Sequence, residues 1–446
     1  MKKTVLVKTK LPGPVSKKLI DKDEKYVSRS YTRGHQAVFD RAKGCYIWDV
    51  DGNKFIDFHA GIGVCSTGNC HPQVVEAIKI QVDKAIHIAT ADFYNEPVGK
   101  LAEKLCQIAP GKFPKRVFFT NSGTESVEAS LKLARYNKRK PRMIAFIGAF
   151  HGRSMGSLSL TCSKVTQRRY FAPLLPEVTH VPYAYCYRCV FNLTYPKCDY
   201  ACVKFIDEVI LKKVAPAEEV AALFVEPIQG EGGYIVPPPE YHKKLKEMCE
   251  KHGILFVADE VQSGMGRTGK MFAIEHWGVV PDIIAVAKAL ASGLPLGACI
   301  ASKELMSWEP GAHSTTFGGN PVACSAGLAT MELLEGGLIK NAAKMGNSIM
   351  KQLEKMMQNH RSIGDIRGKG LMIGIELVKD KKKKTPAPEM AEELMQECFR
   401  NGLMILTCGP NSVRFIPPLI VDEETASEAL AIFEKSLTKV ERKIKR

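Results

Sequence analysis

Two ionisable residues stand at the ends of apolar runs. Lys288 ends the run 283–288, and Asp259 ends the run 254–259. A lysine is costly to bury in its charged form, so its pKa should fall there, and it can then form a Schiff base with a carbonyl. Singly, each residue has an ordinary alternative: an exposed lysine at a strand terminus, and an aspartate that caps a helix or forms an ion pair. Together they indicate catalysis.

A carboxylate and an imine-forming lysine are the groups that pyridoxal 5′-phosphate requires. The carboxylate keeps the pyridine nitrogen protonated, so the ring accepts electrons, while the lysine holds the aldehyde. The phosphate needs an anion site as well. Ser122, Gly123 and Thr124 lie between a predicted strand at 116–120 and a predicted helix at 126–138, where N–H groups and the helix dipole favour a phosphate. Such a turn is common, so the triplet is informative only beside Lys288 and Asp259.

The elements that must position these residues alternate between short apolar runs and amphipathic stretches. Strands are predicted at 116–120, 143–147, 223–225, 254–259 and 283–288, and a helix at 239–252 that Gly253 closes. The alternation predicts the α/β class, with a mostly parallel sheet covered by helices. Ligands bind outside the carboxyl ends of strands in such sheets, so polar residues at strand ends are the candidates for chemistry.

The length of 446 residues suggests two or three domains at roughly 150 residues each. After residue 321 the pattern changes to a long helix at 322–335 and strands at 371–377 and 413–416, which is typical of a smaller α+β domain. A hairpin signal at 45–53 is expected to pack against that domain. The predicted division is an N-terminal segment at 1–64, a large cofactor-binding domain at 65–325 and a small domain at 326–446.

Composition excludes several classes. Hydrophobic residues make up 45% and charged residues 25%, which is typical of a globular rather than a disordered chain. No apolar run approaches the ~20 residues that cross a bilayer, and the apolar stretch at the start is too short for a secretory signal. We therefore expect a cytoplasmic protein without a membrane partner.

The net charge is +16, from 63 Lys and Arg against 47 Asp and Glu. This balance raises the alternative of a nucleic-acid-binding protein, which predicts aromatic residues interleaved with a basic face. The excess lies largely in the termini and in the run 381–384, where solvated surfaces are usual. We expect no nucleic-acid partner.

Fourteen cysteines are present, and four of them crowd together: Cys186, Cys189, Cys198 and Cys202. The first pair has CxxC spacing and the second CxxxC, so a four-thiolate zinc site, disulfide pairing and plain packing are all open. The short gap between the pairs and the absence of a histidine count against zinc. No metal site is predicted.

Five motifs occur in order along the chain. They are Asn121-Ser122-Gly123-Thr124-Glu125, Phe150-His151-Gly152, the run 226–233 (EPIQGEGG), the run 259–264 (DEVQSG) and the run 316–321 (TFGGNP). With Lys288, this series resembles the class III aminotransferases, which include 4-aminobutyrate, ornithine and acetylornithine aminotransferases, over residues 31–418. The resemblance implies a fold type I enzyme with a seven-stranded sheet and a smaller α+β domain. It also implies a homodimer, or a higher even-numbered oligomer, with shared active sites.

The resemblance assigns roles to individual residues. Lys288 would bind the cofactor aldehyde and carry the proton, Asp259 would pair with the pyridine nitrogen, and Gln262 would bond the ring hydroxyl. Ser122, Gly123 and Thr124 would hold the phosphate, with Thr316 reaching the phosphate of the neighbouring subunit and Phe150 stacking on the ring. The remaining residues of the implied cofactor site are His151, Glu226 and Val261.

Arg414 matches the arginine that grips a substrate carboxylate; its alternative is a surface arginine on an edge strand. In ω-aminotransferases the glutamate matching Glu231 pairs with that arginine when the substrate presents a distal amine. Tyr31 and Asp92 lie where the family builds its substrate entrance. The implied function is ping-pong transfer of an amino group from an ω-amino acid, 4-aminobutyrate- or ornithine-like, to 2-oxoglutarate. The alternative is an amino-acid racemase on the same fold, and Glu231 favours transamination because racemase-like relatives can depart from glutamate there.

Overall fold

The computed structural model describes residues 4–444, which divide into two compact units. The terminal unit comprises Met1–His71 with Lys340–Arg446, and the central unit comprises Pro72–Ile339. The boundaries therefore lie at 71/72 and 339/340 rather than at the predicted 64/65 and 325/326. The second boundary moves because helix α10 (Pro321–Leu333) packs against α3 (Pro72–Lys84) and α4 (Glu96–Ile108) and so belongs to the central unit.

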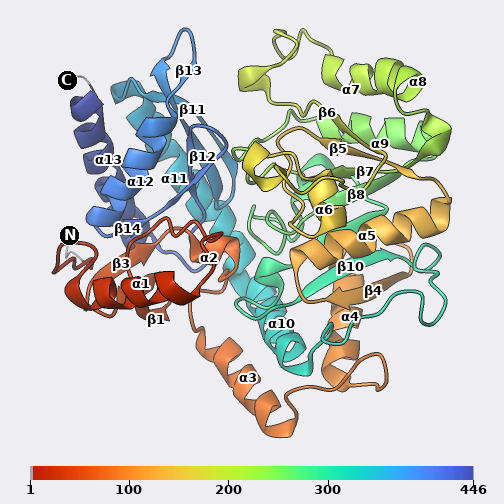
Figure 1. The fold of residues 1–446 in the computed structure, drawn as a ribbon, viewed down its shortest axis with the longest axis horizontal. Coiled ribbons are helices and arrows are strands. Elements are labelled where there is room, and N and C mark those ends of the chain that lie inside the picture. Colours follow the sequence, from red (N-terminus) through yellow and green to blue (C-terminus); the bar gives the residue numbers. More distant parts are fainter. Residues whose placement is uncertain (1–3, 445–446) are drawn as a thin grey trace. The chain divides into compact units, whose positions relative to one another are not determined.

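A seven-stranded sheet forms the core of the central unit (Figure 1). Its spatial order is β4 (Lys115–Thr120), β10 (Gly297–Ser302), β9 (Ile283–Val286), β8 (Leu255–Asp259), β7 (Val220–Val225), β5 (Arg142–Phe146) and β6 (Val178–Val181). Only β10 runs antiparallel to its neighbours. The structure confirms the predicted α/β class with a mostly parallel sheet of seven strands.

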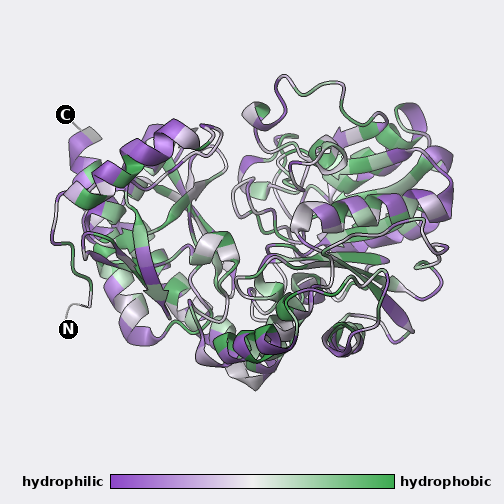
Figure 2. Cartoon of the chain, turned by 60° about the horizontal axis from the view of Figure 1, so that its bottom comes forward, coloured by the Kyte–Doolittle hydropathy of each residue, from purple (hydrophilic) through white to green (hydrophobic). Residues whose placement is uncertain are grey.

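Helices cover both faces of this sheet. Helix α5 (Gly123–Lys138) contacts β4, β7, β8, β9 and β10 and buries a cluster that includes Phe224 and Val257. On the opposite face, the ring of His242 in α9 (Tyr241–His252) lies 6.4 Å from that of Phe256. Every residue of β7, β8 and β9 is buried, which explains why these strands read as continuous apolar runs. Figure 2 shows the inner strands of this sheet as mainly hydrophobic and the helices as mixed. The shorter helices of the unit are α6 (Met155–Leu160), α7 (Ala201–Phe205) and α8 (Leu211–Lys213).

One helical run, Pro321–Asn359, is long and apolar enough to cross a membrane by length and composition alone. Half of its apolar window is buried inside the protein. The run is also broken, because Gly337 has a φ of 145° between α10 and α11 (Ile339–Asn359). Its small residues, such as Ala326 and Gly327, allow α10 to lie close to α3 and α4. The apolar character of α10 is therefore accounted for by helix packing.

The terminal unit contains two small sheets. The first has the order β1 (Phe39–Lys43), β2 (Tyr46–Asp49), β3 (Lys54–Asp57) and β14 (Leu403–Met404). The hairpin expected at 45–53 is the β2–β3 pair. Strand β14 pairs with β3 in parallel, so the N-terminal and C-terminal segments of this unit share one sheet. The second has the order β11 (Ile363–Lys369), β12 (Met372–Asp380), β16 (Ser412–Phe415) and β15 (Leu406–Cys408), with β13 (Thr385–Pro386) beside β12. The helices are α1 (Pro14–Tyr26), α2 (Ala60–Gly63), α11, α12 (Pro388–Arg400) and α13 (Glu423–Ile444).

The candidate residues of the central unit follow the carboxyl ends of its parallel strands. Asp259 is the last residue of β8 and Glu226 directly follows β7, as the sequence predicted. Lys288 differs, because β9 ends at Val286 and Lys288 begins the short 3₁₀ helix Lys288–Leu290 with a φ of 44°. The prediction of a strand running through Lys288 is wrong by two residues.

Candidate active site

One cavity of about 270 Å³ collects the candidate residues of the central unit. It lies at the carboxyl edge of the sheet, where parallel α/β sheets place their ligands. The residues that line it are Ser122, Gly123, Thr124, Phe150, His151, Gly152, Arg153, Glu226, Glu231, Asp259, Val261, Gln262 and Lys288. Five separate loops therefore converge on one space.

The first wall of the cavity is the N-terminus of α5. Ser122 is its N-cap residue and accepts a hydrogen bond from the backbone N–H of Glu125. The first turn of a helix leaves N–H groups without intrahelical partners, and the helix dipole adds positive potential there. A side chain at Gly123 would place its Cβ 2.6 Å from Val261 Cγ1, so glycine keeps this approach open. The arrangement is suited to a phosphate group.

Hydroxyl groups hold the neighbouring part of this wall. Thr124 Oγ1 lies 2.7 Å from Ser154 Oγ, and Ser154 Oγ donates to Glu128 Oε1 at 2.6 Å. Gly152 has a φ of 135°, and a Cβ there would come within 2.3 Å of Thr124 Oγ1. The hydroxyl of Thr124 is thus fixed by its neighbours and packed against bare backbone.

A chain of buried ionisable groups forms the floor of the cavity. His151 Nδ1 lies 2.7 Å from Asp259 Oδ2, and Asp259 Oδ1 accepts from the backbone N–H of Val261 at 3.0 Å. Glu226 accepts at 3.0 Å from the backbone N–H groups of both Phe150 and Gly230. These bonds hold Asp259 and Glu226 rigidly.

Burial controls the charge of this floor. Desolvation raises the pKa of Glu226 to about 7, opposed by the charge of His151 and reinforced by that of Asp259. Burial also disfavours the charged form of His151, but the hydrogen bond and charge of Asp259 outweigh it and raise the pKa of the imidazole. Glu226 therefore exchanges its proton near neutral pH.

We expect Glu226→Gln to remove a pH dependence of stability. The pKa of Glu226 in the folded state, about 7, exceeds its ordinary value of 4.5, so the folded chain binds the proton more tightly. The resulting stabilisation is complete below about pH 4.5 and is lost as the pH rises through 7. The variant should match the wild type at pH 5 and exceed its unfolding free energy by about 3 kcal/mol at pH 8. Urea unfolding of the apoprotein at both pH values measures this. Exposed Glu247→Gln is the control, and an equal difference at both pH values for Glu226→Gln would contradict the assignment.

Two buried polar atoms of the cavity residues lack a protein partner. Within residues 4–444, His151 Nε2 and Gln262 Oε1 have no hydrogen-bond partner. Buried polar groups are otherwise nearly always satisfied. These two atoms fit pyridoxal 5′-phosphate, an anionic ring with polar substituents. The anion site at the N-terminus of α5, the carboxylate of Asp259 and the amine of Lys288 fit the same group. The ring would stack on Phe150.

Lys288 lines the same cavity from an unusual backbone conformation. Its φ of 44° lies in the left-handed region, which costs a residue with a side chain about 1–3 kcal/mol. The preceding strand β9 is fully buried between β8 and β10, so it fixes the position of the Lys288 backbone. The strain at this position accords with a residue placed for chemistry.

Comparisons with known proteins bear on what this site is. Residues 26–437 match the family described as Aminotransferase class-III. The chain is 40% identical over 448 residues to the alanine/serine racemase of Pyrococcus horikoshii, which covers 98% of this chain and 94% of that protein. It is 40% identical over 435 residues to the 4-aminobutyrate aminotransferase of Mycobacterium leprae, which covers 96% of this chain and 97% of that protein. The chain belongs to the class III aminotransferase family.

Solved structures agree with this assignment. The ornithine aminotransferase from Toxoplasma gondii, described with pyridoxal phosphate at its active site, superposes with a TM-score of 0.84 at 29% identity, covering 98% of this chain and 97% of that one. This class III aminotransferase therefore has fold type I, and its cofactor is pyridoxal 5′-phosphate. When bound, that cofactor acts as an electron sink for a carbanion.

Four residues that the sequence placed in the site do not line this cavity. In the central unit, Asp92 and Thr316 are exposed and lie outside its lining. Tyr31 and Arg414 belong to the terminal unit. Tyr31 is exposed, whereas Arg414 is 5% exposed on β16, between β12 and β15. The alternative of a surface arginine on an edge strand is therefore wrong.

Sequence reasoning missed three residues of this class III aminotransferase. Arg153 and Gly152 line the cavity, and of the two only Gly152 stood within a recognised motif. Lys164 does not line the cavity but donates to Glu231 Oε1 at 2.6 Å. A basic residue directly after the His151-Gly152 pair was a usable signal for Arg153. Lys164 had no such signal, because it is 67 positions from its partner.

The cysteine cluster shows no sign of a metal site. All fourteen cysteines are free, including Cys186, Cys189, Cys198 and Cys202. In the part of the chain from residue 4 to residue 444, no group of three or more His, Cys, Asp or Glu side chains could hold a metal ion. The zinc alternative thus has no ligand geometry among these residues, and no disulfide joins the thiols.

Proposed function

We propose that this class III aminotransferase moves an amino group from an ω-amino acid, 4-aminobutyrate- or ornithine-like, to 2-oxoglutarate in a ping-pong cycle. The observation that carries this choice is the position of Glu231, which lines the same cavity as Lys288. The relative from Mycobacterium leprae is named for 4-aminobutyrate. In this scheme Lys288 Nζ carries the proton from the donor carbon that bears the nitrogen, Asp259 stabilises the protonated ring nitrogen, and Arg414 binds a substrate carboxylate.

The second candidate is an amino-acid racemase, because the relative from Pyrococcus horikoshii is an alanine/serine racemase. Racemisation needs a second acid or base that delivers a proton to the opposite face of the α-carbon. Of the carboxylates that line the cavity, Glu226 and Asp259 are engaged with backbone N–H groups, and Glu231 with Lys164. These engagements hold the three carboxylates in place, and the proposal therefore assigns the proton transfer to Lys288, which favours transamination.

A donor panel separates the two candidates. The holoenzyme is incubated with 4-aminobutyrate, L-ornithine and several L-amino acids, each with and without 2-oxoglutarate, while glutamate and the D-enantiomers are followed. Glutamate that forms only with the oxo acid supports transamination and identifies the donor. A D-amino acid that accumulates without any oxo acid contradicts it and supports racemisation.

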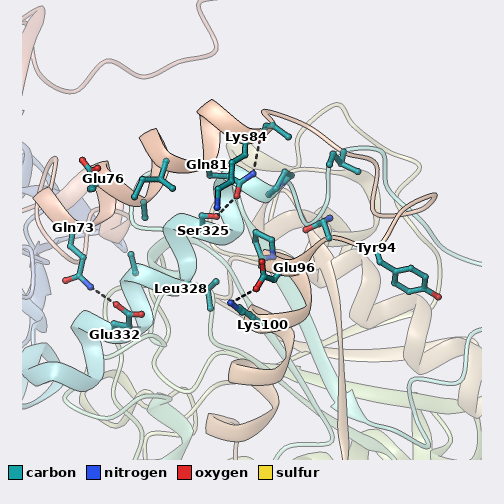
Figure 3. Close-up of a pocket in the computed structure, with 18 residues that line it drawn as sticks. Gln73, Glu76, Gln81, Lys84, Tyr94, Glu96, Lys100, Ser325, Leu328 and Glu332 are labelled. Atoms are coloured by element: carbon teal, nitrogen blue, oxygen red, sulfur yellow. Dashed lines mark hydrogen bonds and ion pairs between the residues drawn. The ribbon is translucent and has the colours of Figure 1, made fainter.

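We propose further that the enzyme is a homodimer. A groove of about 970 Å³ lies between α3, α4 and α10 of the central unit (Figure 3), with apolar side chains such as Ile80 and Leu328 among its lining. Ion pairs and hydrogen bonds frame it, including Glu96 with Lys100 at 2.6 Å. Tyr94 of the lining is fully exposed, and three further apolar side chains, those of Ile86, Phe93 and Phe317, are exposed in the central unit. A patch of this kind marks an interface, and a second copy of the chain is the occupant that brings exposed Thr316 to a neighbouring cofactor site.

We expect Ile80→Glu to weaken the dimer. Ile80 is 49% exposed in the single chain and lines the groove, so a glutamate would be buried without a partner on association, at a cost of about 2–5 kcal/mol. Light scattering after size exclusion should show the monomer in the variant and the dimer in the wild type. Val214→Glu alters a residue that is 51% exposed outside the groove and should leave the dimer intact. A dimeric Ile80→Glu protein would exclude this face.

We propose a cytoplasmic location as well. Fourteen free thiols with no disulfide among them are typical of a reducing compartment.

A further inference from the structure

A network of three hydroxyl groups and one carboxylate adjoins the N-terminus of α5. Thr124 Oγ1 lies 2.7 Å from Ser154 Oγ and also contacts Ser157 Oγ. Glu128 Oε1 accepts from Ser154 Oγ at 2.6 Å and from the backbone N–H of Ser157 at 3.0 Å. Thr124 lines the cofactor cavity, so the network links the cavity wall to Glu128, one turn further along the same helix.

Two glycines make room for this network. Gly152 has a φ of 135°, and a Cβ there would lie 2.3 Å from Thr124 Oγ1 and 2.5 Å from Ser157 Oγ. A Cβ at Gly156 would lie 2.1 Å from Glu128 Oε2. A side chain at either position would displace these oxygen atoms, so the close approach of the loop at 152–157 to α5 depends on bare backbone.

The direction of the hydroxyl protons follows from the carboxylate. An ionised carboxylate only accepts hydrogen bonds, and the single hydroxyl proton of Ser154 goes to Glu128. In the bond between Ser154 and Thr124 the donor is therefore Thr124. Thr124 Oγ1 in turn accepts from the backbone N–H of Ser154 at 3.2 Å. The hydroxyl proton of Thr124 is thus used within the protein, and the donor that this residue offers to a phosphate is its backbone N–H in the first turn of α5.

Glu128 also supplies a cap for the helix that follows the loop. Ser154 is the N-cap residue of α6, but the acceptor for the N–H of Ser157, in the first turn, is Glu128 Oε1. Because Ser157 is buried, loss of that carboxylate would leave a buried donor unsatisfied, which is costly. Ser154 could then donate to Thr124, which would reverse the bond between them. Both changes would loosen the loop at 152–157 beside the first turn of α5.

We infer that Glu128 is a positioning residue for the cofactor phosphate, because it holds the loop at 152–157 against α5 and fixes the direction of the Thr124 hydroxyl. This role requires the phosphate to lie at the N-terminus of α5 and is independent of the amino donor. The carboxylate of Asp259, which would face the ring, is held by His151 and by the N–H of Val261 instead. Glu128 therefore acts on the phosphate of the cofactor and not on its ring.

The test compares pyridoxal 5′-phosphate with pyridoxal, which lacks the phosphate. Each is titrated into the full-length chain after removal of the cofactor, and quenching of tryptophan fluorescence gives the dissociation constant. Glu128→Leu should raise the constant for pyridoxal phosphate about tenfold and leave that for pyridoxal unchanged, since the two hydrogen bonds that hold the loop are lost. Glu128→Gln keeps an oxygen in the place of Oε1, which accepts both bonds, so it should bind both ligands as the wild type does.

Two further variants locate the effect within the network. Ser154→Ala removes the bond to Glu128 by a smaller change, should also weaken pyridoxal phosphate alone, and carries the test if Glu128→Leu does not fold. Thr124→Val removes the hydroxyl at nearly constant shape. The double variant Thr124→Val/Glu128→Leu should lose no more affinity than Glu128→Leu, because both changes act through one network. Losses that add up would place the Thr124 hydroxyl directly on the phosphate.

Glu275 provides a matched control. Its carboxylate accepts from the backbone N–H of Phe272 at 2.7 Å, at the start of a short 3₁₀ helix outside the cavity, so Glu275→Leu should leave both constants unchanged. Equal weakening of both ligands by Glu128→Leu, unchanged or tighter binding of pyridoxal phosphate, or additive losses in the double variant would overturn the role of Glu128. Because no turnover is measured, a failure of the proposed transamination appears in the donor panel and leaves this titration interpretable.

Discussion

Lys288→Ala should abolish covalent attachment of the cofactor and reduce turnover by at least about 10⁴-fold. Lys288 is the lysine that lines the cavity, two residues beyond the end of buried β9 and with a φ of 44°. Loss of the nucleophile and of a general acid–base group removes two separate contributions, of which the second alone provides about 10²–10⁴-fold. Borohydride treatment followed by mass spectrometry should add pyridoxal phosphate to the wild-type chain and not to the variant.

The control for this variant is another lysine of the central unit. Lys270 donates to Glu275 O at 2.9 Å on the surface, so Lys270→Ala should retain both the label and the turnover. Added methylamine should restore part of the activity of Lys288→Ala, because a small amine occupies the space left by the side chain. A labelled and active Lys288→Ala protein would refute the assignment.

Asp259→Asn should lower turnover by about 10²–10⁴-fold with the fold intact. The carboxylate accepts from His151 and from the backbone N–H of Val261, and an amide keeps this shape while losing the charge. Without the charge the ring nitrogen no longer stays protonated, so the cofactor accepts electrons poorly. Burial lowers the pKa of His151, whereas the hydrogen bond and charge of Asp259 raise it, so the imidazole of the variant should lose its proton at a lower pH than that of the wild type. Steady-state kinetics from pH 5 to pH 9 measures both effects.

Asp282, which directly precedes β9, offers a control. Its carboxylate accepts from the backbone N–H of Phe256 at 2.7 Å and from Lys246, at the opposite end of β8 from Asp259. Asp282→Asn should cost stability and leave turnover per folded molecule unchanged. A similar loss of turnover in both variants would mean that Asp259 acts through the fold alone.

The strands and the cofactor residues were predictable because their signals are local. β7 and β8 are buried on both faces, so they read as apolar runs, and their polar successors Glu226 and Asp259 necessarily lie at one edge of a parallel sheet. The end of α9 was equally local, because Gly253 takes the left-handed φ of 65° that closes a helix.

The domain boundary and the backbone conformation of Lys288 were harder to predict from the sequence. A helical pattern at 322–335 does not reveal whether α10 packs with the elements before it or after it, and its contacts with α3 and α4 decide that. Likewise the apolar run 283–288 does not show that the strand stops at Val286 and that Lys288 turns into a left-handed conformation.

By itself, the sequence determined the class of the protein: the α/β sheet, the order of its motifs, and the lysine, aspartate and phosphate cradle that indicate pyridoxal phosphate. Only the tertiary structure determined which charged side chains lie next to one another. His151 and Asp259 are 108 positions apart, Lys164 and Glu231 are 67 apart, and Arg414 lies on an interior strand. The physical reason is that periodicity and turn chemistry act over a few residues, whereas an ion pair between loops depends on how the strands beneath them are ordered.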